Sequence, residues 1–289
     1  MAKTPRYPNP RPVADESGEA SPNVVKLRNV YQRKSGRREG QDIWIVDGAR
    51  IRRDVFDEFL QGGNDQRYRF VPHNEIWIDG TTSAEEYIYA LMHELHERRQ
   101  MLTLGLSYDH AHRESLMLEL QARRKNAIDS DVHELQLPPM PPMDSEGNQE
   151  IEDIGDKVRL RDVYRAKLPM RDHLDVWVVD GAIVRRDVYP DFGFSGNGFY
   201  FQFIPKNELW IDDQVNCAEM EYQLIHQVRE RAAMAKGSNA ETAYGSGSAL
   251  QTEARRRDAA LAARKELRQP PVTLGTRDRG TGKSGRKRI

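Results

Sequence analysis

Phe70-Val-Pro-His-Asn-Glu-Ile-Trp-Ile-Asp79 occurs a second time in the chain, 133 residues later, as Phe203-Ile-Pro-Lys-Asn-Glu-Leu-Trp-Ile-Asp212. Three further pairs of segments match at the same offset, namely 26–31 with 159–164, 43–48 with 176–181, and 52–55 with 185–188. One offset that holds through four matches without a gap indicates a tandem duplication. We therefore expect two copies of one folding unit.

Each copy is predicted to begin with a small sheet. Residues 43–47 and 75–78 are dominated by β-branched and aromatic side chains, which favours strands. Asp47-Gly48 is a turn signal, so residues 49–55 are predicted to return as the second strand of a hairpin. Residues 68–71 are predicted as a further short strand that ends at Pro72, and Gly62-Gly-Asn-Asp65 predicts a loop.

Two helices are predicted after the sheet. Thr82 or Ser83 is suited to cap the first helix, and Gly105 is suited to end it near residue 104. Ser107 or Asp109 begins a second helix that reaches residue 125. The expected fold class is α+β: a tandem repeat of a small antiparallel sheet followed by a helical hairpin, in a pseudo-twofold arrangement.

Composition divides the chain into five parts. We expect a disordered arm at 1–24, the first copy at 25–125, a Pro-rich linker at 126–156, the second copy at 157–268 and a basic disordered tail at 269–289. The first copy is expected to pack on the second copy or on another chain.

Charge and hydropathy exclude several classes of protein. The formal net charge is −1 and the pI is about 6.7, which argues against a dedicated nucleic-acid binder and leaves only weak contacts by the basic tail. No apolar run approaches the roughly 18 residues of a membrane span, and the first residues lack the apolar core of a secretory signal. Cys217 is the single cysteine, so a multi-thiolate zinc site is excluded and a cytoplasmic location is expected.

The segment Leu91-Met-His-Glu-Leu-His-Glu-Arg98 carries the candidate chemistry. On a helix, His93 and Glu97 lie one turn apart on the same face, about 6 Å between their Cβ atoms. Glu94 follows His93 and lies about 100° round the helix. In an H-E-x-x-H helix the residues at these two positions hold zinc and the glutamate acts as the base. The layout therefore predicts a metal site with Glu94 as its catalytic base.

A third metal ligand is expected from the second helix, and two residues qualify. His112 is the better zinc ligand in chemical terms and is near enough if the helices cross obliquely. Glu119 suits a strictly antiparallel hairpin, in which it returns beside His93 and Glu97. Both remain candidates from the sequence.

The F-[VI]-P-x-N-E-[IL]-W-I-D segment, followed by H-E-x-x-E and a later A-H, resembles zincin-like metallopeptidase domains and small bacterial and phage proteins of the same strand–helix arrangement. The interval from His93 to Glu119 is similar to that in thermolysin-like peptidases, where the third ligand is a glutamate on a later helix. The resemblance implies one zinc ion held by His93, Glu97 and a residue of the next helix. Glu97 replaces the second histidine of the usual motif, and such a carboxylate-rich set also suits iron or manganese.

The second copy is predicted to be degenerate. His226 and Glu230 match His93 and Glu97, but Gln227 stands in place of Glu94 and has no useful basicity. His112 is aligned with Gly245 or Ser246, and Glu119 with Thr252 or Glu253. The first copy is therefore expected to be the working half.

Three functions are compatible with these residues. The first is a metal-dependent hydrolase, best described as a peptidase that acts on a peptide or protein, with Tyr108 as an oxyanion donor and the 75–78 strand as an edge for an extended substrate. The second is a non-catalytic structural or interaction protein. The third is an iron or manganese site rich in carboxylates, to which Asp109 and His112 contribute.

Overall fold

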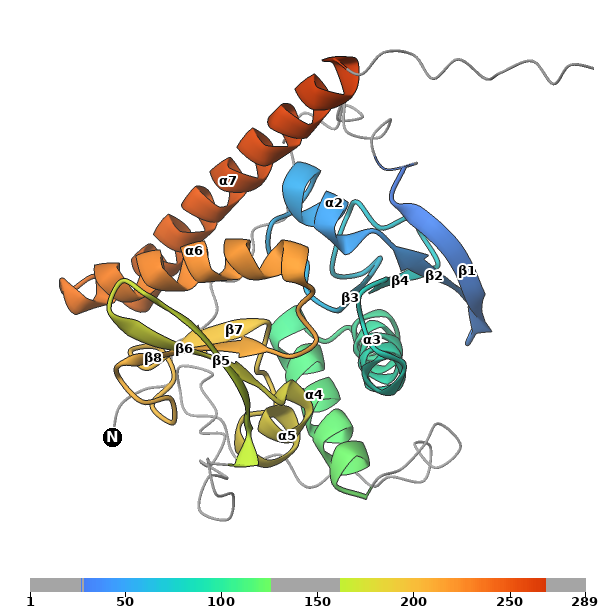
Figure 1. Ribbon diagram of the computed structural model, residues 1–289. Coiled ribbons are helices and arrows are strands. Elements are labelled where there is room, and N and C mark those ends of the chain that lie inside the picture. Colours follow the sequence, from blue (N-terminus) through green and yellow to red (C-terminus); the bar gives the residue numbers. More distant parts are fainter. Residues whose placement is uncertain (1–26, 28, 126–161, 269–289) are drawn as a thin grey trace, which may run out of the picture.

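The computed structural model describes residue 27, residues 29–125 and residues 162–268 (Figure 1). The predicted arm at 1–24, linker at 126–156 and tail at 269–289 lie outside the described residues. The described chain contains two four-stranded sheets, and each is followed by a pair of long helices. This arrangement confirms the α+β class and a two-part organisation.

The first sheet has the strand order β1-β2-β4-β3. β1 (Tyr31–Arg38) and β2 (Gln41–Val46) form an antiparallel hairpin, β2 pairs in parallel with β4 (Glu75–Asp79), and β3 (Gly62–Asn64) pairs with β4 in antiparallel fashion. The prediction of a wholly antiparallel sheet is therefore wrong for the β2–β4 pair. A parallel pair needs a crossover connection, and helix α2 (Gly48–Asp54) forms part of it.

Helix α2 occupies the segment predicted as the returning strand of a hairpin, and that prediction is wrong. The Asp47 side chain accepts a hydrogen bond from the backbone N–H of Arg50 (3.0 Å), so it caps a helix instead of opening a hairpin turn. The helix buries Ile51 completely in the core. Two shorter predictions also fail, because residues 68–71 form turns and the predicted loop at 62–65 begins with strand β3.

β4 lies inside the sheet, between β2 and β3. The edge role predicted for residues 75–78 is therefore wrong, since both sides of this strand already pair with neighbours. The edge strands of this sheet are β1 and β3, and β3 is the one beside β4.

The second half repeats this order as β5-β6-β8-β7. Its strands are β5 (Tyr164–Arg171), β6 (Leu174–Val179), β7 (Ser195–Asn197) and β8 (Glu208–Asp212). Helix α5 (Gly181–Ile183) and a π-helical turn, η4 (Val184–Val188), stand where the first half has α2. The central registers agree as well, because Trp44 lies opposite Trp77 and Trp177 lies opposite Trp210.

The helix predictions for the first half are confirmed. α3 (Ala84–Leu104) is capped by Ser83, whose hydroxyl accepts the backbone N–H of Glu86 (3.2 Å), and it ends at Gly105 with φ +66°. α4 (Tyr108–Lys125) returns beside it. The second half has the corresponding pair α6 (Cys217–Ala235) and α7 (Ala240–Arg268).

Apolar packing holds α3 against the sheet. Four isoleucines on one face of β2 and β4 are buried against Ala90 and Leu91 of α3: Ile43, Ile45, Ile76 and Ile78. Complete burial of each such side chain is worth roughly 2 kcal/mol. This contact brings the middle of α3, with His93 and Glu97, beside β3.

The two halves contact each other through buried arginines. Arg52 pairs with Asp79 of its own half (2.7 Å) and with Glu219 of the other (3.0 Å). Arg185 pairs with Asp212 of its own half (2.5 Å) and with Glu86 of the other (3.1 Å). Alongside these pairs, α2 packs against α7 and α4 against η4 (Figure 1).

Candidate metal centre

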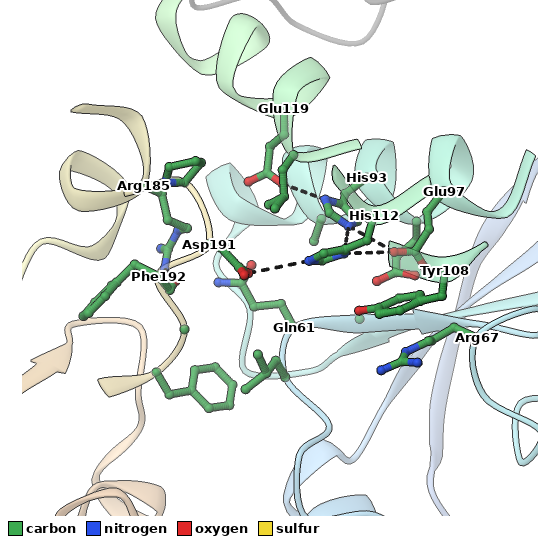
Figure 2. A pocket seen from close by; sticks show the side chains of 18 of the residues that line it. Gln61, Arg67, His93, Glu97, Tyr108, His112, Glu119, Arg185, Asp191 and Phe192 are labelled. Carbon is green, nitrogen blue, oxygen red and sulfur yellow. Dashed lines mark hydrogen bonds and ion pairs between the residues drawn. The ribbon is translucent and has the colours of Figure 1, made fainter. Parts of the chain in front are cut away.

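α3 and α4 bring together the side chains of His93, Glu97 and His112 (Figure 2). Nε2 of His93 lies 3.0 Å from Nδ1 of His112 and 3.5 Å from Oε2 of Glu97. Nδ1 of His112 lies 3.0 Å from the same oxygen. Within the described ranges, this is the one set of three histidine, cysteine or acidic side chains whose ligand atoms could share an ion.

The triangle fits a zinc ion. Zinc holds nitrogen and oxygen ligands at about 2.0–2.2 Å in tetrahedral geometry, so two ligands of one ion lie about 3.3–3.6 Å apart. The three separations of 3.0, 3.0 and 3.5 Å need only small side-chain shifts to match. Three protein ligands leave a fourth position open, as in catalytic zinc sites.

Glu119 lies behind His93 and is not part of this set. Its Oε2 lies 3.0 Å from Nδ1 of His93, and its Oε1 accepts a hydrogen bond from Arg123 (2.8 Å). Burial alone would raise the pKa of Glu119, but Arg123 and His93 lower it to about 2. The ionised carboxylate can only accept, so Nδ1–H of His93 donates to it and Nε2 is left to face the other two ligands. Of the two candidates for a third ligand, the geometry favours His112.

Glu94 lies beside the ligand triangle and lines the same pocket. Its Oε2 accepts a hydrogen bond from Nδ2 of Asn64 (2.8 Å). Burial first and the nearby Glu97 carboxylate second raise the pKa of Glu94 to about 7. A carboxyl group with this pKa can both accept and release a proton near neutral pH, as a general base must.

Asn64 on β3 is a site residue that the sequence analysis missed. Its Nδ2 donates to Glu94 and also to Oε1 of Glu97 (2.9 Å). Its Oδ1 accepts the backbone N–H groups of Gln66 and Arg67 (3.0 and 3.1 Å), which fixes the orientation of the amide. The signal was present in the sequence, because Gly63-Asn64 recurs as Gly196-Asn197 at the common offset.

Tyr108 stacks on His112, with ring centroids 5.2 Å apart and an interplanar angle of 24°. The Arg67 guanidinium lies 3.3 Å from the centroid of the tyrosine ring. Burial, followed by the Glu97 carboxylate, raises the pKa of Tyr108 well above its usual value. The phenol therefore keeps its proton and can donate a hydrogen bond into the pocket that it lines (Figure 2).

The pocket at the ligand triangle has a volume of about 130 Å³ and is lined by both halves of the chain. The second half contributes Arg185 and residues 190–194. Among these, Oδ1 of Asp191 lies 3.7 Å from Nε2 of His112 (Figure 2). Asp191 could not be predicted as a site residue, because a repeat pattern does not tell which loop of one copy faces the site of the other.

Opposite charges balance inside the site. Burial alone would lower the pKa of His93, but Glu119 and Glu97 outweigh it and raise this pKa well above the usual value. Burial alone would raise the pKa of Glu97, but hydrogen bonds from His112 and His93 hold it well below the usual value. A metal ion that enters this site must therefore displace protons from the histidines.

Comparison of the chain with protein-family models, with curated proteins and with solved structures found no match. Among the described helices, none has both the length and the apolar character needed to cross a membrane. The second half of the chain supplies a comparison of its own, because it repeats the arrangement of side chains around His93. We call this arrangement the side-chain frame; in the first half it consists of Asn64, His93, Glu94, Glu97, His112 and Glu119.

In that frame, Asn197 donates to Gln227 (2.8 Å) and Glu230 (3.0 Å) as Asn64 does to Glu94 and Glu97. Nδ1 of His226 lies 3.1 Å from Gln251, and its ring lies 4.8 Å from that of Tyr244. Tyr244 and Gln251 therefore hold the places of His112 and Glu119. The predicted equivalents at 245–246 and 252–253 are wrong, because α6 reaches Gly237 with one residue fewer than α3 uses to reach Gly105.

In the second half, the histidine and the glutamate of the side-chain frame are both uncharged. Burial lowers the pKa of His226 to about 4 and raises the pKa of Glu230 to about 8. Both groups are therefore neutral at pH 7, and the second histidine of the first half is replaced by a phenol. The frame is present in both halves, but only the first half presents a charged ligand set.

Proposed function

We propose that the first half of the chain is a metal-dependent hydrolase, with zinc as its metal, and that it acts on peptides or proteins. The observation that carries this proposal is the convergence of His93, Glu97 and His112 at ligand spacing, with the Glu94 carboxyl beside them. The H-E-x-x-E resemblance to zincin-like peptidases agrees with it.

Each side chain has a role in the proposed reaction. A bound zinc ion supplies a Lewis acid that polarises a carbonyl oxygen and lowers the pKa of water toward about 7. Glu94 accepts a proton from the attacking water and passes it to the leaving amine. Tyr108 donates a hydrogen bond to the oxygen on which negative charge develops. Asn64 holds both Glu94 and Glu97 in place.

Two features support a peptide as substrate. β3 ends the sheet beside the pocket and pairs with no second strand within the described ranges, so an extended peptide can add there. Apolar side chains line the pocket next to the ligands, including Leu60, Leu116 and Phe194. Such a surface suits one apolar side chain of a substrate.

We also propose that the two halves arose by tandem duplication and are related by a pseudo-twofold axis. The equal strand orders and the reciprocal pairs of Arg52 and Arg185 support this relation. In a twofold arrangement, each contact from the first half to the second has a counterpart in the opposite direction.

The test of the hydrolase is metal analysis combined with peptide hydrolysis by the full chain and by Glu94→Gln. We expect one zinc ion per chain in both proteins. Hydrolysis of a fluorogenic peptide library should fall by about 10²–10⁴-fold in the variant, because the base is lost and the ligands remain. Glu85→Gln, an exposed change on the same helix, is the control and should leave both readings unchanged.

Other results would point to the alternatives. Iron or manganese in the purified protein, with zinc unable to replace it, would favour the carboxylate-rich iron or manganese site. A protein that takes up no metal and cleaves no peptide would favour the structural or interaction role. Equal activity in the wild type and Glu94→Gln would remove Glu94 as the base.

A further inference from the structure

We infer that the second half completes the metal centre of the first by positioning both histidine ligands from one segment, residues 185–191. This inference rests on the proposed metal site. It assigns a role to the half that lacks the ligands.

The first contact is with His112. Its Nδ1 faces Glu97 and His93, so Nε2, on the other side of the ring, is directed away from the ligand triangle. Asp191 lies on that side, with Oδ1 3.7 Å from Nε2 (Figure 2). A histidine that binds a metal through one nitrogen commonly presents its other N–H to a carboxylate, which fixes the tautomer and the ring. Asp191 is placed to do this for His112.

The second contact reaches His93 through a chain of buried ion pairs. Nδ1 of His93 lies 3.0 Å from Glu119, whose second oxygen pairs with Arg123 (2.8 Å). Arg123 pairs with Glu86 through two hydrogen bonds of 2.7 Å, and Glu86 lies 3.1 Å from Nε of Arg185. The orientation of His93 is thus linked to an arginine of the second half.

The corresponding chain in the other direction stops short of a ligand. Arg52 pairs with Glu219 (3.0 Å), and Glu219 pairs with Arg255 (2.6 Å). Gln251 takes the place of Glu119 there, and Nε of Arg255 has no hydrogen-bond partner among the described residues. Glu58 stands at the position equivalent to Asp191, and the residue equivalent to His112 is Tyr244. Only the second half therefore reaches both imidazoles of the other half, His93 through the ion pairs that begin at Arg185 and His112 through Asp191.

The test compares Asp191→Asn with the wild-type full chain. We expect zinc to dissociate 10–100-fold more readily from the variant, the usual effect of losing a carboxylate partner of a ligand histidine. The affinity is measured by competition with a chromophoric chelator. The absorption spectrum of the cobalt-loaded protein and the ¹⁵N shifts of His112 should also change, which a merely structural role would not produce. Asp191→Glu should restore most of the affinity.

Glu58→Gln is the matched control, because it makes the same acid-to-amide change at the equivalent position of the other half. It should bind zinc as the wild type does. Zinc affinity and cobalt spectrum unchanged in Asp191→Asn would overturn this inference and leave the proposed function standing. A wild-type protein that binds no zinc would overturn both.

Discussion

Glu97 and Glu230 are the same residue type at equivalent helix positions, yet their surroundings leave Glu97 ionised and Glu230 neutral at pH 7. Glu97 accepts hydrogen bonds from two imidazoles and stays ionised. Glu230 is buried with one hydrogen-bond donor, Asn197, and its pKa rises to about 8. The difference comes from two neighbours on the next helix, Tyr244 and Gln251, which cannot supply the charges of their counterparts.

The neutral, buried carboxyl group of Glu230 predicts that the stability of the fold depends on pH. The pKa of Glu230 is about 8 in the folded chain, above its ordinary value of 4.5. Between these two pH values folding takes up a proton, so the free energy of unfolding falls as pH rises from 4.5 to about 8. Glu230→Gln removes the titration and should gain roughly 2–4 kcal/mol over the wild type between pH 5 and pH 8. Urea unfolding at both pH values measures the difference. The exposed change Glu253→Gln should show no such gain, and equal pH slopes for wild type and Glu230→Gln would contradict the assignment.

At the scale of elements, caps and helix periods were predictable because they depend on residues close in sequence. Ser83 and Gly105 set the ends of α3 as expected. Residues 49–55 were predicted as a strand because Asp47-Gly48 suits both a hairpin turn and a helix start, and the burial of Ile51 decides for the helix. β3 has three residues, two of them glycine, and is a strand only because β4 pairs with it.

The candidate site likewise has residues that the local sequence could predict and residues that only the fold brings together. His93 and Glu97 share a helix turn, so their spacing was enough to predict them as partners. The choice between His112 and Glu119 depends on how α3 and α4 cross, and only the fold shows it. Asn64 and Asp191 reach the site from distant segments, and propensity or periodicity carries no information about such contacts.

Two of the glycines in the helix pairs, Gly105 and Gly245, predict opposite effects of alanine. Gly105 ends α3 with φ +66° and open space around its Cβ position, so Gly105→Ala should cost about 1 kcal/mol through backbone strain alone. Gly245 lies exposed inside α7, also with open space, and Gly245→Ala should stabilise the chain by about 0.5–1 kcal/mol. Thermal unfolding of the two variants checks the signs. A destabilised Gly245→Ala would show that the first turns of α7 are not the regular helix described.

At the scale of the whole molecule, the side-chain frame occurs in both halves, but its histidine and glutamate are charged only in the first half. Asn197, His226 and Glu230 repeat the positions of Asn64, His93 and Glu97, and Asn197 donates to Glu230 as Asn64 does to Glu97. The second half therefore lacks only the side chains that supply charge and a third ligand. Its backbone already places residues 227, 244 and 251 at the positions that Glu94, His112 and Glu119 occupy in the first half.

The triple variant Gln227→Glu, Tyr244→His, Gln251→Glu should acquire a second zinc site. We expect the zinc content to rise from one to two ions per chain, because the new histidine meets His226 and Glu230 and the new carboxylate replaces the amide at Nδ1 of His226. Equilibrium dialysis followed by metal analysis gives the stoichiometry. Gln227→Glu alone should remain at one ion. A folded triple variant that still holds one ion would show that the two frames differ in geometry as well as in side chains.

Arg52 and Arg185 each pair with a carboxylate of the opposite half. These reciprocal pairs determine whether either half can fold and work as a separate fragment. A fragment limited to the first half would keep His93, Glu97 and His112 but would lose Arg185, one of the two arginines beside Glu86, and Asp191 beside His112. Glu86 would keep Arg123 and Arg52 would keep Asp79, but each would lose a buried partner of opposite charge, and a buried charge that is less compensated destabilises the fold. The pair of halves is therefore the smallest unit expected to carry the proposed activity, and activity from separate polypeptides of the two halves would require that they complement each other in solution.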